Sequence, residues 1–154
     1  MLRGPFFTVS ILTDYSIDLR VYYEDTDFGG VVYYANYLKF MEHARTDFLR
    51  TLGYNQSQLF EEQRRMFVVR SAQLEYFAPA RFDDVLSVSV QVEQLRRASI
   101  RFVQRCSRDN PPDGVSSHGV AETLVTGDIL IACLDADSFK PCAIPGNLKT
   151  VLNS

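Results

Sequence analysis

The chain has 154 residues, of which 46% are apolar and 23% are charged, and its formal net charge is −3. Length and composition indicate one globular domain with a core of ordinary size, and no apolar run approaches the roughly 20 residues of a membrane-spanning helix. The slight negative charge excludes a global basic field for nucleic acid or an anionic membrane, although a local basic patch could bind phosphate groups.

The first predicted element is a strand. Residues 1–16 have a short apolar stretch without a cleavage-site pattern, so we expect an irregular N-terminal extension and not a signal peptide. Residues Ile17 to Glu24 alternate between apolar and polar side chains, which predicts a half-buried strand. The acids and paired glycines of Asp25 to Gly30 predict a loop. Residues 17–154 are expected to form the single domain.

A long helix is predicted next, between Asn36 and Leu52, because apolar residues recur there at steps of three and four. Its apolar face consists of Tyr37, Met41, Ala44, Phe48 and Leu52. Asn36 is the expected N-cap and Gly53 the expected C-terminal stop. A shorter polar helix on the surface is expected at Ser57 to Arg64.

The rest of the chain predicts strands. They are expected at Met66–Tyr76, Val85–Leu95, Ser99–Ser107 and Val120–Leu134. Gly127 lies inside the last of these and indicates a bulge or a close approach of another group. A loop is expected at Asp109–Gly119, and an irregular tail follows the last strand. One amphipathic helix and several antiparallel strands pack most simply as an α+β fold in which a curved sheet wraps around the helix.

The loop before the helix carries the candidate chemistry. Three acids, Glu24, Asp25 and Asp27, precede Gly29 and Gly30. Acids near a helix start are common for electrostatic reasons alone, so a solvated loop is the simpler interpretation. Glycines, however, let a ligand approach the backbone, and the unpaired N–H groups of a first helical turn can stabilise an oxyanion. A carboxylate beside them could attack a thioester carbonyl or activate water.

Several segments resemble one known family. The run RVYYEDTDFGGVVYYANY at residues 20–37 resembles the active-site segment of the 4-hydroxybenzoyl-CoA thioesterase-like hotdog proteins. The blocks EHART at 42–46, FVVR at 67–70 and EYFAPARFDD at 75–84 make the chain most similar to the Tol–Pal-associated acyl-CoA thioesterase branch. The resemblance covers residues 17 to 146 and implies a hotdog fold with thioester hydrolase activity.

The resemblance also implies roles for residues of the loop. The family's catalytic carboxylate matches Asp27, and its oxyanion contact, a backbone amide at the helix start, matches Tyr34. Gly29 and Gly30 match the glycines of the family loop, and Val31 and Tyr33 are expected to contact substrate. The family further implies a homodimer or a homotetramer with active sites at the dimer interface, which would also cover exposed sheet edges.

One position departs from the closest branch. Members of the Tol–Pal-associated branch often carry histidine where this chain has Tyr34, whereas the 4-hydroxybenzoyl-CoA enzymes can carry tyrosine. The role of the Tyr34 side chain and the choice between aliphatic and aromatic acyl groups therefore stay open.

Other polar residues are weaker candidates. Arg96 and Arg97, at a predicted hairpin, could bind the phosphates of coenzyme A, although solvated hairpin charges are more common. Glu42 is the second candidate acid, and its simpler interpretation is pairing with neighbours on the helix surface. His43 and His118 are isolated and do not form a metal site.

The cysteines predict no further chemistry. Cys106, Cys133 and Cys142 have neither metal-binding nor redox spacing, and an odd number argues against a disulfide framework. We interpret Cys106 and Cys133 as ordinary strand or core residues. A cytoplasmic, reducing compartment fits this usage.

The sequence thus predicts hydrolysis of an acyl-CoA or an acyl-carrier-protein thioester, with Asp27 as nucleophile or as general base for water. No metal or redox cofactor is expected, and coenzyme A enters only as part of the substrate. A hydratase or dehydratase is less favoured, because that chemistry usually needs histidine beside the acid. A non-catalytic thioester-binding protein and a thioesterase dedicated to one biosynthetic pathway, with a polyketide or aromatic acyl group, remain as alternatives.

Overall fold

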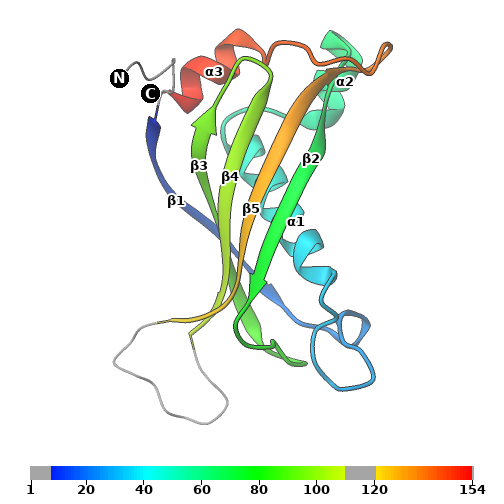
Figure 1. Cartoon of the computed structure of the whole chain (residues 1–154), viewed down its shortest axis with the longest axis vertical. Coiled ribbons are helices and arrows are strands. Elements are labelled where there is room, and N and C mark those ends of the chain that lie inside the picture. Colours follow the sequence, from blue (N-terminus) through cyan, green and yellow to red (C-terminus); the bar gives the residue numbers. More distant parts are fainter. Residues whose placement is uncertain (1–7, 110–120, 154) are drawn as a thin grey trace.

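In the part of the chain that the structure describes, five antiparallel strands form one sheet; the longest helix lies along one face, and two shorter helices lie near one end (Figure 1). The structure, a computed structural model, describes residues 8–109 and 121–153. The strands are β1 (Thr8–Arg20), β2 (Arg65–Tyr76), β3 (Val85–Leu95), β4 (Ser99–Arg108) and β5 (Glu122–Asp135), in the order β1-β3-β4-β5-β2. The helices are α1 (Asn36–Thr51), α2 (Gln56–Gln63) and α3 (Gly146–Leu152). The architecture is α+β, as predicted.

The longest described helix, α1, lies along one face of the sheet (Figure 1). Its predicted face is confirmed, because Tyr37, Met41, Ala44 and Phe48 are all buried. They pack in one apolar cluster with alternate residues of the three central strands. From the sheet this cluster includes Leu86, Val88, Val90, Val92, Ile100, Phe102, Cys106, Ile129, Ile131 and Cys133. The spacing of apolar residues in the helix and in the strands therefore defines the apolar face of α1 and the face of the sheet against which it packs.

The ends of α1 were predicted with unequal success. Gly53 has φ +90 and the Tyr54 N–H donates to the Leu49 carbonyl over 2.9 Å, so the helix ends at a glycine in the left-handed conformation, as predicted. The predicted N-cap was wrong, since Ala35 occupies that position and Asn36 is the first helical residue. The Asn36 side chain donates to the carbonyl of Asp25 instead, over 2.8 Å. A local pattern could not reveal this partner, which lies 11 residues earlier.

The first strand differs most from its predicted bounds. It was predicted at 17–24, but β1 begins at Thr8 and ends at Arg20. Residues 8–16, expected as part of an irregular extension, pair with β3, where Thr8 lies opposite Gln94. Backbone hydrogen bonds to a neighbouring strand thus stabilise a segment whose side chains alternate poorly. At the other end, Tyr23–Asp25 forms a short 3-10 turn that stops the strand.

The tail was predicted to be irregular, and this was wrong for residues 146–152. They form α3, which starts directly after Pro145 and buries Leu148 and Leu152 in the core. Proline disfavours helical backbone in the residue before it but permits a helix to begin after it. The short polar helix was predicted correctly to within one residue, and α2 is capped by Asn55, whose side chain accepts from the N–H of Ser57. The loop predicted at 109–119 lies almost wholly outside the described residues.

Gly127 of β5 lies directly beneath the side chain of Met41 in α1. A Cβ atom built at this position would lie 2.6 Å from the Sδ atom of Met41. The predicted close approach is therefore confirmed, and a residue without a side chain lets the helix pack against β5.

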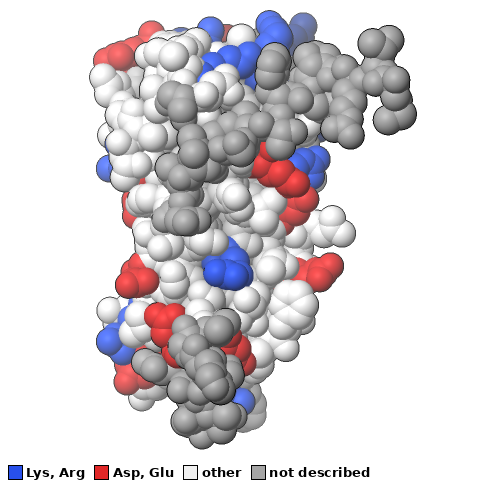
Figure 2. All heavy atoms as spheres, turned by 90° about the vertical axis from the view of Figure 1, so that its left-hand side faces the viewer, with Lys and Arg blue, Asp and Glu red and all other residues white. Residues whose placement is uncertain are grey.

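The face turned toward β1 carries scattered charge. In Figure 2, acidic and basic side chains alternate with uncharged ones, and the described residues in this view form no continuous basic area. Within the described residues, no helix is long and apolar enough to cross a membrane.

Candidate functional site

The loop between β1 and α1 holds Asp27 in an exposed tight turn. The Asp27 N–H donates to the Val31 carbonyl over 2.9 Å, and the Gly30 N–H donates to the Asp27 carbonyl over 3.0 Å. One carboxylate oxygen of Asp27, Oδ1, accepts the N–H of Gly29 over 2.8 Å. The charge-assisted bond orients the carboxylate while the side chain stays accessible to solvent.

Both glycines of the loop have a structural reason. A Cβ atom on Gly29 would lie 3.2 Å from Oδ1 of Asp27, so a larger residue would press on the carboxylate that Gly29 orients. Gly30 has φ +77, a backbone conformation that glycine adopts without steric cost. The turn therefore depends on glycine at both positions, independently of any role in substrate binding.

A second aspartate fastens this loop to the start of α1. Asp25 is only 6% exposed, and its Oδ2 atom accepts the Tyr22 N–H over 2.8 Å. Its backbone carbonyl accepts from the Tyr33 N–H over 2.9 Å and from the Asn36 side chain over 2.8 Å. The loop thus folds back on the residues that enter the helix. This structural role of Asp25 was not predicted, because its partners Tyr33 and Asn36 lie 8 and 11 residues further along the chain.

The connection between β2 and β3 contacts the loop that joins β1 to α1. Val32, which is buried, donates its N–H to the Ala80 carbonyl over 2.9 Å. Val31 forms a bridge with Arg81, and the Ala80 N–H donates to the Tyr37 hydroxyl over 3.0 Å. The block at 75–84, singled out by its resemblance, therefore contacts the candidate loop and the start of α1 directly.

An ion-pair network anchors that connection to the sheet. Arg108, which is 5% exposed, donates to Asp84 over 2.6 Å, to Glu122 over 2.7 Å and to the Pro79 carbonyl over 3.3 Å. One buried guanidinium thus ties the ends of β4 and β5 to residues 79–84. Charges paired in this way tolerate burial, whereas either partner alone would be costly.

The helix start presents the backbone that was expected to bind an oxyanion. Within the described part of the chain, no residue accepts a hydrogen bond from the Tyr34 N–H. The Tyr34 carbonyl accepts the hydroxyl of Tyr76 over 3.0 Å, which fixes the next peptide plane. Tyr76 was not among the predicted site residues, and nothing in its own strand pattern indicated this contact.

The two tyrosines before the helix face solvent. Tyr33 and Tyr34 are 45% and 63% exposed, so both side chains are accessible beside the loop. Their rings lie 4.7 Å apart, and a hydrogen bond between the side chains raises the pKa of Tyr33 above its ordinary value. By contrast, Tyr37, predicted on the apolar face of the helix, and the nearby Phe40 are buried in the core.

Arg96 and Arg97 lie far from the loop within one chain. They form the exposed turn between β3 and β4, and the Ile144 N–H donates to the Arg97 carbonyl over 2.8 Å. The strand β3 starts beside the end of β1, next to the Asp27 loop, and carries the chain to the opposite end of the sheet (Figure 1). A single chain therefore brings Asp27, Gly29, Gly30, Val31, Tyr33 and Tyr34 together and leaves both arginines apart.

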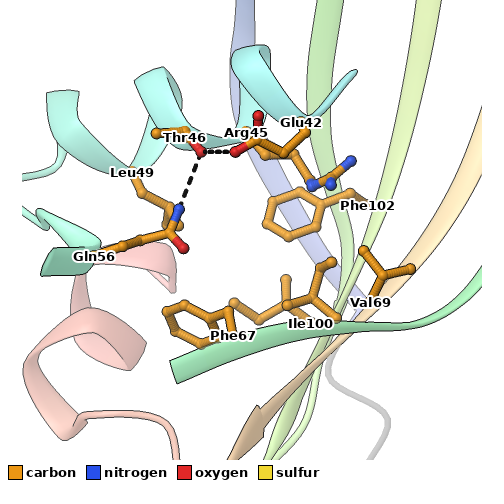
Figure 3. A pocket seen from close by; sticks show the side chains of 10 residues that line it. Glu42, Arg45, Thr46, Leu49, Gln56, Phe67, Val69, Ile100 and Phe102 are labelled. Carbon is orange, nitrogen blue, oxygen red and sulfur yellow. Dashed lines mark hydrogen bonds between the residues drawn. The ribbon is translucent and has the colours of Figure 1, made fainter. Parts of the chain in front are cut away.

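A cavity of about 120 Å³ lies further along α1 (Figure 3). Its polar side is formed by the helices and its apolar side by the sheet. The lining residues are Glu42, Arg45, Thr46, Leu49, Gln56, Phe67, Val69, Ile100, Phe102 and Ile131. Glu42 accepts the Thr46 hydroxyl over 2.7 Å, so the predicted pairing on the helix occurs, and His43 is exposed beside it.

Arg45 is the unexpected member of this lining. It is 7% exposed and donates to Oε1 of Gln104 over 2.8 Å, while Gln104 in turn donates to the Met41 carbonyl over 3.0 Å. Burial lowers the pKa of Arg45, and the nearby charge of Glu42 opposes this shift. The buried guanidinium of Arg45 is therefore held by the neutral side-chain amide of Gln104.

No metal centre emerges from the described residues, since no group of three or more His, Cys, Asp or Glu side chains in them is arranged to hold an ion. His118 lies outside the residues that the structure describes.

A family model described as the thioesterase-like superfamily matches residues 21–152. The chain belongs to the thioesterase-like superfamily. The predictions of the hotdog family and of the enzyme class, a thioester hydrolase, are confirmed.

Curated relatives of this thioesterase-like protein match along most of its length. It is 40% identical over 139 residues to the acyl-CoA thioesterase YbgC of Haemophilus influenzae, which covers 90% of this chain and 94% of the relative. It is 40% identical over 131 residues to the acyl-CoA thioester hydrolase YbgC of Escherichia coli O157:H7, covering 84% and 89%.

Solved structures share the fold. A probable thioesterase from Bartonella henselae is 32% identical, with a TM-score of 0.72 and coverage of 84% of this chain and 98% of that one. A 4-hydroxybenzoyl-CoA thioesterase variant in complex with 4-hydroxybenzoyl-CoA has a TM-score of 0.77, with coverage of 90% and 97%. It is 22% identical, so this likeness supports the hotdog fold alone.

Proposed function

We propose that this protein hydrolyses acyl-CoA thioesters and that Asp27 is its catalytic carboxylate. The reaction class rests on the family and on the YbgC relatives, whose names specify acyl-CoA thioesters. The assignment of Asp27 is supported by the turn at 27–31, which holds an accessible, oriented carboxylate shortly before the start of α1. The Tyr34 N–H at this helix start has no acceptor among the described residues. Carrier-protein thioesters are a second substrate of the same chemistry.

The proposed mechanism needs no metal or redox cofactor, and coenzyme A enters as part of the substrate. Gly29 holds one oxygen of Asp27, so the other is available to attack the thioester carbonyl or to take a proton from water. Charge develops on the carbonyl oxygen in either case. The Tyr34 N–H, reinforced by the helix dipole, would stabilise it, and the Gly loop would admit the thioester between them. The leaving group is the thiolate of coenzyme A.

A second copy of the chain would complete the site. In the described sheet β2 is an edge strand, and exposed apolar residues, among them Val69 and Tyr76, lie along it. Antiparallel pairing of two β2 strands would place the Arg96–Arg97 end of one sheet toward the Asp27 loop of the other. We therefore propose a homodimer, able to associate further into a homotetramer, in which these arginines bind the phosphates of coenzyme A. Its proposed location is the cytoplasm.

The decisive experiment compares wild type with Asp27→Asn in thiol release from short, long and aromatic acyl-CoAs. Asparagine preserves the size of the side chain and removes the charge, so we expect kcat/KM to fall by about 10²–10⁴-fold while the circular dichroism spectrum is unchanged. The wild-type ranking across the panel would define the preferred acyl group.

The matched control is Glu24→Gln, which removes an exposed acid from the same loop. It should retain wild-type activity, because no contact ties Glu24 to the turn at 27–31. Equal activity of wild type and Asp27→Asn would eliminate the carboxylate mechanism. If wild type turned over no CoA ester but did cleave an acyl-carrier protein, the carrier would be the substrate; binding without any turnover would instead identify a thioester-binding protein.

A further inference from the structure

Two cysteines lie side by side where the C-terminal tail crosses the end of β5. Their Sγ atoms are 3.6 Å apart, although nine positions separate Cys133 from Cys142 in the sequence. Cys133 is buried, whereas Cys142 is half-exposed. The spacing of the two cysteines did not indicate a redox pair, because a turn at residues 135–140 is what returns the chain to the strand.

The backbone geometry is compatible with a bond between them. Leu134 and Pro141 form an antiparallel bridge, and the Cys142 N–H donates to the Cys133 carbonyl over 2.9 Å. The Cys133 N–H donates to the Ala98 carbonyl, so the two cysteines share one backbone hydrogen bond. Opposed residues of antiparallel segments have Cα atoms about 4.5–5.5 Å apart, within the roughly 4.4–6.8 Å spanned by disulfides. Rotation of the two side chains can therefore close the remaining gap between the sulfur atoms without moving the strands apart.

We propose that Cys133 and Cys142 are a reversible oxidation site that forms an intrachain disulfide with a small-molecule disulfide as the oxidant. The accessible Cys142 reacts first as its thiolate, forms a mixed disulfide with one sulfur of the oxidant and releases the other as a thiolate. Cys133 then loses its proton to solvent, attacks Sγ of Cys142 and expels the second thiolate. Two protein thiols are oxidised, and one small disulfide is reduced to two thiols, which take up two protons.

The surroundings fix this order of reaction. Burial is the main cause that raises the pKa of Cys133 to about 12, and its hydrogen bond with Cys142 adds to the shift. The charge of Arg65 acts in the opposite direction but is the smallest contribution. Cys133 is therefore poorly reactive toward an external oxidant and becomes effective only when the partner sulfur is activated beside it.

The bond would fasten the tail to the sheet. Cys142 leads through Ile144 into α3, whose Leu148 and Leu152 belong to the core. Cys133 lies opposite Phe67 of β2, which lines the cavity along α1. Oxidation therefore constrains the segment that closes this end of the molecule. Short-lived disulfides of this kind are the form expected in a reducing compartment.

The test is to incubate the folded, full-length protein with oxidised glutathione, quench with acid, alkylate under denaturing conditions and measure the intact mass. The chain has three cysteines, so we expect three alkylated thiols before oxidation and one after it, with the loss of two hydrogens and full reversal by dithiothreitol. The melting temperature of the oxidised protein should rise by roughly 5 °C, since the bond restricts the unfolded chain.

Three variants separate this site from incidental oxidation. The Cys106→Ala variant lacks the buried cysteine that lies outside the pair, so it should still lose two thiols on oxidation. Cys142→Ser, at the half-exposed position, should lose none, and Cys133→Ser should accumulate a stable glutathione adduct. Retention of all three thiols in the wild type, a lasting wild-type adduct or a cross-link between two chains would each overturn the proposal.

Discussion

Asp25 and Asp27 carry the same side chain in opposite surroundings. Asp25 is buried and accepts the N–H of Tyr22, so its carboxylate is part of the backbone framework of the loop. Asp27 is exposed, and its carboxylate receives one N–H, from Gly29. The difference shows why two acids of one short motif have separate functions: the first shapes the loop, and the second is available for chemistry.

Tyr76 provides a prediction at the scale of one hydroxyl group. Tyr76→Phe removes the hydrogen bond to the Tyr34 carbonyl, which leaves the peptide next to the proposed oxyanion amide less firmly held. A bond of this kind is worth about 1 kcal/mol, so we expect kcat to fall roughly 3- to 10-fold with little change in KM. Steady-state kinetics with the best acyl-CoA would measure both parameters.

Tyr23→Phe is the matched control for Tyr76→Phe. Tyr23 is 77% exposed and stacks on Phe82, with ring centroids 4.0 Å apart, a contact that phenylalanine preserves. Its kinetics should match the wild type. A Tyr76→Phe enzyme with wild-type kcat would show that the hydroxyl does not position the helix start.

At the scale of elements, Met41 of α1 lies directly against Gly127 of β5. Gly127→Val places a branched side chain where a single Cβ would already come within 2.6 Å of the Met41 sulfur. Overpacking of this kind costs about 1–3 kcal/mol in the free energy of unfolding, because either Met41 leaves its rotamer or α1 moves from the sheet. Urea denaturation would measure the loss.

The cause can be identified by a double-mutant cycle. Met41→Ala alone creates a cavity and is expected to destabilise the protein by about 2–5 kcal/mol. In the double variant, the valine side chain would fill part of that cavity. The double variant should therefore be destabilised less than the sum of the two single effects, by about 1 kcal/mol or more. If the two changes in the free energy of unfolding were strictly additive, the contact with Met41 would not be the cause of the destabilisation by valine.

At the scale of the whole molecule, β2 is an edge strand of the described sheet, so a second copy of the chain could pair with its outer side. We expect the wild type to elute with a mass of at least twice the 17.6 kDa of one chain, measured by light scattering coupled to gel filtration. Arg70 lies at an irregularity where β2 has no partner residue in β5. Arg70→Pro should therefore disturb the outer edge more than the internal ladder, and lower the dimer fraction.

Arg70→Ala controls for the loss of the arginine side chain. It should keep the wild-type mass, because pairing of strands depends on backbone groups. If both variants and the wild type were monomeric and fully active, the proposed contribution of a second copy to the site would be excluded.

Much of the architecture followed from local pattern. The 3.6-residue period located α1 within one residue, and alternation located β3 at its observed bounds, because each period records which side chains face the same core. The candidate loop was likewise visible in one continuous stretch, since an acid, two glycines and a helix start are neighbours in the chain. The family and its reaction class were predictable because the blocks at 20–37, 42–46, 67–70 and 75–84 resemble known hotdog thioesterases.

The remaining features depend on residues that meet only after folding. The extension of β1 depends on its pairing with β3. The burial of Arg45 depends on Gln104 of β4, and the cysteine pair depends on a turn in the tail. The separation of Arg96 from the loop likewise follows from the direction of β3 across the sheet. By itself the sequence determined most of the elements and the candidate loop, because their signals are local. The tertiary structure decided which distant groups touch, because strand register and chain reversals set those distances.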